Sequence, residues 1–271
     1  MKVMVTAGGT TEKIDEVRSI SNTSTGRLGS LIASRYAALS NVDTVYYICG
    51  KKAAVPQCEK VKIIYIDNVR SLENTIMNLL SREKIDIIVH SMAVSDYRVK
   101  AVTSVSKIAD AIVKKRETLA QLQEQDLKSA ICSLLHTSEI TVCREGKINS
   151  KIDDLLLLME RTPKIISMLK KCSPKSTLVG FKLMDHVPHE TLMETAFHVL
   201  KENDCDFVLA NDLKDVGEEN HVGYLIDRER NCIKAVTKSE IADCIVQATT
   251  RKDESANEGN PFGCNGKHSG V

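Results

Sequence analysis

Glycines and small polar residues follow an apolar run at the start of the chain. The run Val3-Met4-Val5 leads to Gly8 and Gly9, and a second glycine pair, Gly26 and Gly29, begins an amphipathic segment. A buried strand that ends in a glycine loop, followed by the first turn of a helix, brings backbone N–H groups and the positive end of the helix dipole to one place. The stretch therefore predicts an anion site, and phosphate is the usual ligand.

The spacing differs from two common phosphate-binding patterns. A Walker loop needs Gly-x4-Gly-Lys-Ser/Thr, which this stretch lacks. The dinucleotide fingerprint begins its helix at the glycines, whereas here the helix begins well beyond Gly9, and the next apolar strand ends at Ile48-Cys49-Gly50 without an acid to bind a ribose. An alternative is that Gly8 and Gly9 only permit a tight turn. The residues alone leave a phosphate loop and a plain turn both open.

The composition limits the class of protein. A chain of 271 residues with 42% hydrophobic residues is long enough for one sizeable α/β domain. With 37 basic and 36 acidic residues, it has no overall field that favours nucleic acid or a membrane surface as a partner. We expect a cytoplasmic protein, because no apolar run approaches the roughly 20 residues of a membrane span and the chain starts directly as a strand without a signal peptide. The nine cysteines include no Cys-x-x-Cys spacing, so we expect no disulfide framework.

Apolar runs alternate with amphipathic segments over most of the chain, which is typical of an α/β fold with a parallel sheet covered on both faces. We expect strands at 2–6, 44–48, 61–66, 85–89, 155–159, 176–181 and 206–210, a late antiparallel hairpin at 222–226 and 232–236, and helices at 26–39, 69–81, 189–202 and 238–248, with a further helix capped by Thr162 and starting at Pro163. The domain should span 1–248, with a helical insertion at about 103–141. Residues 249–271 should form a disordered tail.

Polar or small residues follow several of the expected strands. His90-Ser91-Met92-Ala93 follows one strand, Lys182 comes directly after Phe181 in another, and Asn211-Asp212 ends a third. In parallel sheets, ligands gather at the carboxyl ends of the strands. We therefore expect these loops and the glycine loop to face one cleft, where the chemistry takes place.

Five short motifs occur in the order found in one enzyme family. They are Asn22-Thr23-Ser24-Thr25-Gly26, Ala93-Val94-Ser95-Asp96-Tyr97-Arg98, Thr162-Pro163-Lys164-Ile165, Val179-Gly180-Phe181-Lys182-Leu183 and Ala210-Asn211-Asp212, and the opening stretch adds Ala7-Gly8-Gly9-Thr10 and Asp15-x-Val17-Arg18. From Val3 to about Ala248 the chain resembles the phosphopantothenate-cysteine ligases of coenzyme A biosynthesis. It looks like the stand-alone bacterial ligase, because it begins where the ligase domain begins and carries no flavin-dependent decarboxylase domain ahead of it.

The resemblance implies a ligase that joins 4′-phosphopantothenate to L-cysteine through an acyl-nucleotide intermediate, with release of a nucleoside monophosphate and pyrophosphate. It also implies a Rossmann-like three-layer fold and a homodimer paired through its later strands. CTP is the expected co-substrate, as in bacteria, with ATP as the eukaryotic alternative, and Mg²⁺ should accompany the triphosphate. We expect no metal held by the protein, no nucleic acid and no membrane partner.

The resemblance also implies roles for particular residues. The expected catalytic residues are Asn22, Arg18 and Lys147; the nucleotide-binding residues are Gly8, Gly9, Ser24, Gly26, Gly29, Asp96, Phe181 and Asn211; and the substrate-binding residues are Asn22, Met92, Ala93 and Asp96. The family has a Lys-Ile-Lys-Lys loop where this chain has Lys147-Ile148-Asn149-Ser150-Lys151. Whether Lys147 or Lys151 serves the phosphate is therefore left open.

Two other functions are weighed against the ligase. A dinucleotide-dependent oxidoreductase is disfavoured by the missing acid after Ile48, and a non-catalytic relative that binds a phosphorylated ligand is suggested by the altered lysine loop.

A metal site could be suggested by three histidines, His186, His189 and His198. They do not form a His-Glu-x-x-His motif, so we expect them to be solvated.

Overall fold

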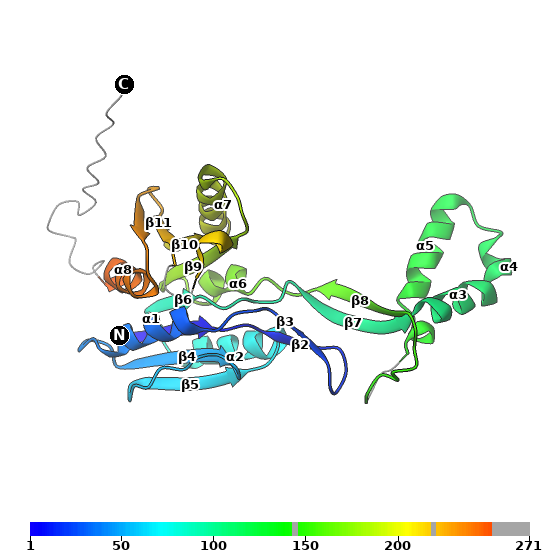
Figure 1. Cartoon of the computed structure of the whole chain (residues 1–271), viewed down its shortest axis with the longest axis horizontal. Coiled ribbons are helices and arrows are strands. Elements are labelled where there is room, and N and C mark those ends of the chain that lie inside the picture. The colour runs from blue at the N-terminus through cyan, green and yellow to red at the C-terminus, as the bar shows by residue number, and fades with distance from the viewer. Residues whose placement is uncertain (143–145, 218–220, 251–271) are drawn as a thin grey trace, which may run out of the picture. The chain divides into compact units, whose positions relative to one another are not determined.

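The computed structural model describes residues 1–142, 146–217 and 221–250, and these form two compact units. The first unit contains residues 1–10 and 23–94 and the chain from Lys164 onward, and the second contains residues 11–22 and 95–163. Figure 1 shows the chain coloured by residue number, so the segments of each unit can be followed. Because five consecutive segments alternate, the chain passes between the units four times.

The first unit is built on an eight-stranded sheet with the order β12-β11-β10-β9-β6-β1-β4-β5. Its members are β1 (Lys2–Ala7), β4 (Thr44–Gly50), β5 (Val61–Ile66), β6 (Ile87–His90), β9 (Thr177–Met184), β10 (Phe207–Asp212), β11 (Gly223–Asp227) and β12 (Cys232–Ala235). The strands from β10 to β5 are mutually parallel, and β11 and β12 add an antiparallel hairpin at one side. This confirms the predicted α/β fold with a mostly parallel sheet and a late hairpin.

Helices cover both faces of this sheet and create two apolar layers. The helices α1 (Arg27–Ala37) and α8 (Lys238–Thr250) pack together on one face, and α2 (Val69–Arg82), α6 (Ile165–Cys172) and α7 (His189–Glu202) cover the other. The side chains of β1 alternate between the layers: Val3 and Val5 join α1 and α8, while Met4 joins α2, α6 and α7. An unbroken apolar strand is therefore buried on both faces, as in other parallel sheets. In the described ranges, no helix is long and apolar enough to cross a membrane.

The second unit has two antiparallel strand pairs and a small helical cluster. One pair is β2 (Thr11–Lys13) with β3 (Ser19–Ser21), and the other is the ribbon of β7 (Tyr97–Ser104) with β8 (Leu155–Arg161). The helices are α3 (Val105–Lys114), α4 (Arg116–Leu119) and α5 (Glu124–Leu135), followed by the 3-10 turn η1 (Ser138–Ile140); a second turn, η2 (Leu213–Asp215), lies in the first unit. Ala111, Leu134 and Ile140 form the buried centre of the helical cluster.

Several local expectations differ from the structure. The expected strand at 155–159 is β8, but it pairs with β7 rather than joining the large sheet, and β2, β3 and β7 were not predicted. Thr162 does not cap a helix: α6 begins at Ile165, with Lys164 as its N-cap. The reason is that the hydroxyl of Thr162 donates instead to the carbonyl oxygen of Ser95 at 2.5 Å.

The last helix extends further than expected. The helix α8 includes Thr249 and Thr250, and Thr249 is buried with its hydroxyl 2.6 Å from the hydroxyl of Tyr36 on α1. The start of the expected tail therefore belongs to the core of the first unit. Residues 251–271, the rest of that tail, lie outside the described residues.

A buried histidine ends β6 beside β1. His90 is 6% exposed, and its Nδ1 lies 2.8 Å from Oγ1 of Thr6, its partner in the parallel register. Burial disfavours the charged imidazolium and lowers the pKa of His90 to about 4. The imidazole is therefore neutral in the folded protein near pH 7.

The pH dependence of stability should reflect His90. In the unfolded chain the histidine pKa is near 6.5, so between pH 6.5 and pH 4 the unfolded state takes up a proton that the folded state does not, and stability falls as pH falls. In His90→Asn, which keeps a polar group near Thr6, the loss of unfolding free energy from pH 7 to pH 5 should be smaller by about 2 kcal/mol. Urea unfolding followed by circular dichroism measures this, because the chain contains no tryptophan. An equal loss of unfolding free energy in the variant and the unaltered protein would contradict the lowered pKa of His90.

Candidate functional site

The loop after β1 is hydrogen-bonded to the loop after β6. The N–H of Ala93 donates to the carbonyl oxygen of Gly8 at 2.8 Å, and the N–H of Thr10 donates to the carbonyl oxygen of Ala93 at 3.2 Å. Gly9 and Ala93 thus extend the parallel pairing beyond the ends of the strands. Three of the predicted site residues, Gly8, Gly9 and Ala93, are brought together at the carboxyl edge of the sheet.

The start of α1 lies against this glycine loop. Gly26 is the N-cap and has φ +69°, and Gly8 has φ +76°, both in the left-handed region that favours glycine. A Cβ on Gly26 would lie 2.9 Å from Cβ of Ala53 and 3.2 Å from the backbone nitrogen of Gly8. The N-cap Gly26 has no side chain to cap α1, and the N–H of Arg27 donates to Oγ1 of Thr25 at 3.4 Å, while the other N–H groups of the first turn point out of the helix end beside the loop. This arrangement supplies the N–H groups and the positive dipole end that an anion requires.

Gly29 sets how closely α1 approaches β1. A Cβ at this position would lie 2.5 Å from Cβ of Ala7 and 2.8 Å from Oγ of Ser91. Ser91 is itself fixed, because its hydroxyl donates to the carbonyl oxygen of Thr6 at 2.7 Å. The helix can therefore pack at this distance only without a side chain at residue 29.

Phe181 and Asn211 lie on the neighbouring strands β9 and β10. Phe181 is partly buried against the apolar layer that contains α1, and Asn211 is buried near the carboxyl end of β10. Nδ2 of Asn211 lies 2.7 Å from Nε2 of His221, to which it can donate. His221 is buried, its Nδ1 has no hydrogen-bond partner among the described residues, and burial together with Lys238 lowers its pKa, so the ring is held neutral. This contact was not predicted, because His221 falls in none of the five motifs.

Asp212, the last residue of the Ala-Asn-Asp motif, braces the loop after β9. Its carboxylate accepts the N–H groups of His186 at 2.8 Å and Val187 at 3.0 Å, and that of Lys214 at 3.2 Å. Burial alone would raise the pKa of Asp212, but these hydrogen bonds hold it at about 2. Asp185, His186 and Asp212 bring possible metal-ligand atoms within 4.8 Å of one another. Both oxygens of Asp212 already accept backbone N–H groups, so this carboxylate stabilises the loop after β9.

The three histidines considered for a metal site have different neighbours. Nδ1 of His186 lies 2.6 Å from the carboxylate of Asp185, His189 packs its ring against Tyr224, and His198 faces Glu202 on the same helix.

Asn22 lies in the second unit and is held by the loop before β7. The hydroxyl of Ser95 donates to Oδ1 of Asn22 at 3.2 Å, and the carbonyl oxygens of Ser95 and Asp96 accept hydrogen bonds from Thr162. The hydroxyl on Oδ1 fixes the orientation of the carboxamide. The Asp96 side chain is exposed.

Met92 and Ser24, two predicted site residues of the first unit, differ in burial. Met92 is 7% exposed and belongs to the apolar layer with α2, α6 and α7. Ser24 is partly buried just before the N-cap of α1. Met92 thus contributes to the core beneath the carboxyl edge.

Arg18 is engaged within the second unit. Its Nε and Nη2 lie 3.0 Å and 2.9 Å from Oδ2 of Asp15, and its Nη2 donates to the carbonyl oxygen of Ile148 at 2.9 Å. Lys147 precedes Ile148 and is exposed. The structure therefore brings Arg18 and the lysine segment together, through an aspartate that was not predicted as a site residue.

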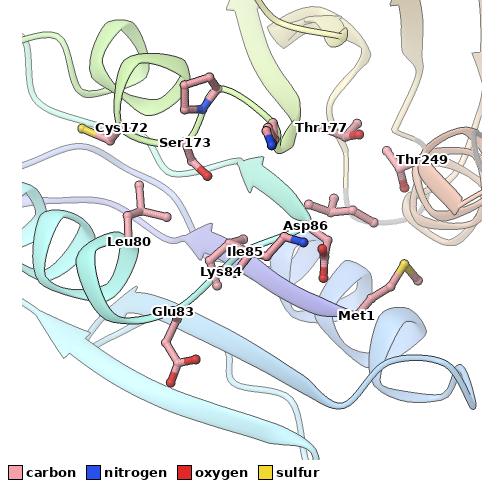
Figure 2. A pocket seen from close by; sticks show the side chains of 13 residues that line it. Met1, Leu80, Glu83, Lys84, Ile85, Asp86, Cys172, Ser173, Thr177 and Thr249 are labelled. Atoms are coloured by element: carbon pink, nitrogen blue, oxygen red, sulfur yellow. The ribbon is translucent and has the colours of Figure 1, made fainter.

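A cavity of about 590 Å³ lies at the opposite edge of the large sheet. Figure 2 shows its lining, which includes Glu83, Lys84 and Asp86 before β6 and Thr177 at the start of β9. None of the predicted site residues lines it. The cavity is at the amino ends of the strands, away from the glycine loop.

A comparison with family models places the chain. The model described as the C-terminal domain of the DNA/pantothenate metabolism flavoprotein matches residues 1–143 and 136–252. The chain belongs to this family. This membership confirms the resemblance drawn from the five motifs.

Known members of this flavoprotein family cover nearly the whole described chain. The coenzyme A biosynthesis bifunctional protein CoaBC of Thermococcus kodakarensis is 29% identical over 243 residues, which are 89% of this chain and 49% of the relative. The CoaBC protein of Methanocaldococcus jannaschii is 24% identical over 253 residues, or 91% of this chain and 49% of the relative. The chain thus spans about half the length of these curated relatives.

Solved structures show the same fold. The DNA/pantothenate metabolism flavoprotein from Streptococcus pneumoniae has a TM-score of 0.72 and 30% identity, with 92% of this chain and 98% of that chain covered. A Cab2 mutant, H337A, in complex with phosphopantothenate-cysteine has a TM-score of 0.61 at 15% identity and covers 92% of this chain and 86% of its own. At that identity the likeness concerns the fold alone.

Gly29→Ala should separate α1 from β1. The new Cβ meets atoms bonded directly to the backbone or fixed by a hydrogen bond, so the helix must shift, and we expect a loss of about 1–3 kcal/mol in unfolding free energy. The shift would also displace the N–H groups at the start of α1. Urea unfolding followed by circular dichroism measures the loss. Ser34→Ala on the same helix is the control, because the Ser34 hydroxyl donates to the carbonyl oxygen of Ser30 within α1 and its loss does not change the distance between α1 and β1. Equal stability of the two variants would contradict the close packing at Gly29.

Proposed function

We propose that this protein is a phosphopantothenate-cysteine ligase, which joins 4′-phosphopantothenate to L-cysteine at the expense of a nucleoside triphosphate. The main support is the carboxyl edge of the parallel strands, where Gly8, Gly9 and the first turn of α1 offer backbone N–H groups to an anion. Family membership over most of the chain supports the same substrate class. A cytoplasmic location is part of the proposal, because all three substrates are small cytoplasmic metabolites.

The reaction needs activation of a carboxylate. A carboxylate is a poor acyl donor, because its carbonyl carbon bears no good leaving group and its negative charge repels an incoming amine. Attack of a carboxylate oxygen on the α-phosphorus gives an acyl nucleotide and releases pyrophosphate. The amino nitrogen of cysteine then attacks the acyl carbon, a nucleoside monophosphate leaves, and the nitrogen loses a proton to give the amide.

The residues of this chain can be given roles in that sequence. In our proposal, Gly8, Gly9, Ser24, Gly26 and Gly29 bind the triphosphate through backbone N–H groups. Mg²⁺ enters with the triphosphate, held mainly by phosphate oxygens and water. Phe181 and Asn211 lie along the nucleotide, with Asn211 oriented by His221.

The acyl group requires donors that add no negative charge. Asn22 suits this role, because an amide N–H can donate to a carboxylate oxygen and to the acyl oxygen that follows it. Ala93 and Asp96 line the substrate in this proposal, and Lys147 offsets the charge that develops on the phosphate. Arg18 acts through its contacts with Asp15 and Ile148.

The proposed co-substrate is CTP, because the resemblance is to bacterial ligases.

A non-catalytic relative is the second candidate function, favoured by Asn149 and Ser150 in place of two family lysines. That candidate predicts nucleotide binding without pyrophosphate release.

Purified protein with phosphopantothenate, cysteine and CTP should release pyrophosphate, and faster than with ATP. Without cysteine, mass spectrometry should find an acyl nucleotide on the protein. Asn22→Asp adds a charge that repels the carboxylate, so its rate should fall by about 100-fold or more. Asn74→Asp, exposed on α2, should match the unaltered protein. No pyrophosphate with either triphosphate would remove the ligase proposal.

We also propose that the protein forms a homodimer. Large apolar side chains remain exposed on the β7–β8 ribbon, including Tyr97 at 49% and Met159 at 37%, and these two share one face of the ribbon. A second chain that covers this face would remove them from water.

Light scattering after size-exclusion chromatography should give the mass of two chains. Met159→Lys places a charge on the proposed contact face, so the variant should shift toward one chain. Met77→Lys, at an exposed methionine of α2, is the matched control and should remain dimeric. A single-chain mass for the unaltered protein, or a dimer unaffected by Met159→Lys, would contradict this proposal.

A further inference from the structure

The segment that carries Lys147 is tied to the β2–β3 hairpin at two points. The N–H of Ile148 donates to Oδ2 of Asp15 at 3.1 Å, and the carbonyl oxygen of Ile148 accepts Nη2 of Arg18 at 2.9 Å. The side chain of Ile148 is 1% exposed. Both backbone groups and the side chain of this residue are therefore held.

Asp15 is the centre of this contact. Its side chain is 2% exposed, and it also accepts the N–H groups of Val17 at 2.9 Å and Arg18 at 2.7 Å, as well as Nε of Arg18 at 3.0 Å. A buried carboxylate with this many donors has one favourable position. Since the guanidinium of Arg18 balances its charge, Asp15 does not need Lys147 as a counter-ion.

The two candidate lysines are held differently. Lys147 lies between Gly146, whose carbonyl oxygen accepts the N–H of Glu16 at 3.5 Å, and the doubly held Ile148. Lys151 lies beyond Asn149, and its N–H donates to Oδ1 of Asn149 within the same turn. The hairpin thus fixes the backbone around Lys147, while the contact at Lys151 is local.

We propose that Asp15 is a positioning residue that fixes, through Ile148, the backbone carrying Lys147, and that Lys147 rather than Lys151 presents its charge to the anionic substrate. This inference rests on the proposed ligase function. Its physical reason is that a charge stabilises a transition state most when its position is set before the reaction. A flexible segment would have to be ordered at each turnover.

The contact should not act as a pH switch. Burial alone would raise the pKa of Asp15, but the N–H groups of Ile148, Val17 and Arg18 hold it at about 2. The carboxylate is therefore ionised throughout the range in which the protein would be assayed. Asp15→Asn should lower the rate without changing the shape of its pH profile between pH 6 and pH 9.

Steady-state pyrophosphate release tests the proposal with Asp15→Asn, Lys147→Met, Lys151→Met and the double variant Asp15→Asn/Lys147→Met. Lys147→Met should lower kcat by about 100-fold or more, and Asp15→Asn by about 10-fold, with little change in KM for phosphopantothenate. The double variant should be no slower than Lys147→Met, because Asp15 acts through Lys147. Lys151→Met should stay within about twofold of the unaltered protein.

A matched control is available in the same hairpin. Glu16→Gln removes an exposed carboxylate that pairs with Lys13 at 3.3 Å and leaves the backbone contact to Gly146 in place. Its rate should equal that of the unaltered protein. If circular dichroism shows that Asp15→Asn does not fold, Asp15→Glu replaces it. This variant keeps the charge but moves it by one methylene, so its loss in kcat should be smaller than the loss of about 10-fold expected for Asp15→Asn.

Amide hydrogen exchange at Ile148 separates this inference from the ligase proposal. Exchange should be slow in the unaltered protein and in Glu16→Gln, and at least about tenfold faster in Asp15→Asn. If the unaltered protein releases no pyrophosphate, the ligase proposal fails, while slow exchange that Asp15→Asn abolishes still supports the contact. In an active protein, unchanged kcat in Asp15→Asn, or additive losses in the double variant, would overturn the positioning role. A larger loss in Lys151→Met than in Lys147→Met would overturn the choice of lysine.

Discussion

Close approach between backbone segments at the carboxyl edge of the large sheet is the constraint on which the first unit depends. A Cβ at Gly8 or Gly26 would meet Ala53, in the loop after β4, at less than 3.0 Å, and a Cβ at Gly29 would meet Ala7 of β1. These glycines therefore set the distances among the glycine loop, the loop after β4, the start of α1 and β1. The same helix covers β1 and β4 and packs against α8. The contact that places N–H groups at the edge therefore also closes one of the two apolar layers.

The large sheet could be predicted because its strands are buried on both faces. Val3-Met4-Val5 and Ile87-Ile88-Val89 are unbroken apolar runs, as expected of strands that are covered on both faces of a parallel sheet. The ribbon of the second unit carries a weaker signal. It has only two strands, and the register shift between Val99 and Ala101 interrupts the alternation of its side chains. The helical insertion was therefore expected to begin at about 103, although β7 continues to Ser104.

The position of the strand ends followed from topology, but the contacts around them did not. Once the strands are parallel, the glycine loop, Ala93 and Asn211 must lie at one edge. The hydrogen bond between Asn211 and His221 spans 10 residues, and that between Asp15 and Ile148 spans 133. Such bonds join single polar groups, leave no periodic pattern in the sequence, and become visible only when the backbone is placed.

The alternation of the chain between the two units has a consequence for biosynthesis. During translation β1 emerges first and can pair with β4 and β6, but β9 to β12 complete the sheet only after the whole second unit has been made. The β2–β3 hairpin leaves the ribosome long before β7, against which it packs. Neither unit corresponds to an uninterrupted stretch of messenger RNA, and the first unit must hold unfinished surfaces until the second has been synthesised.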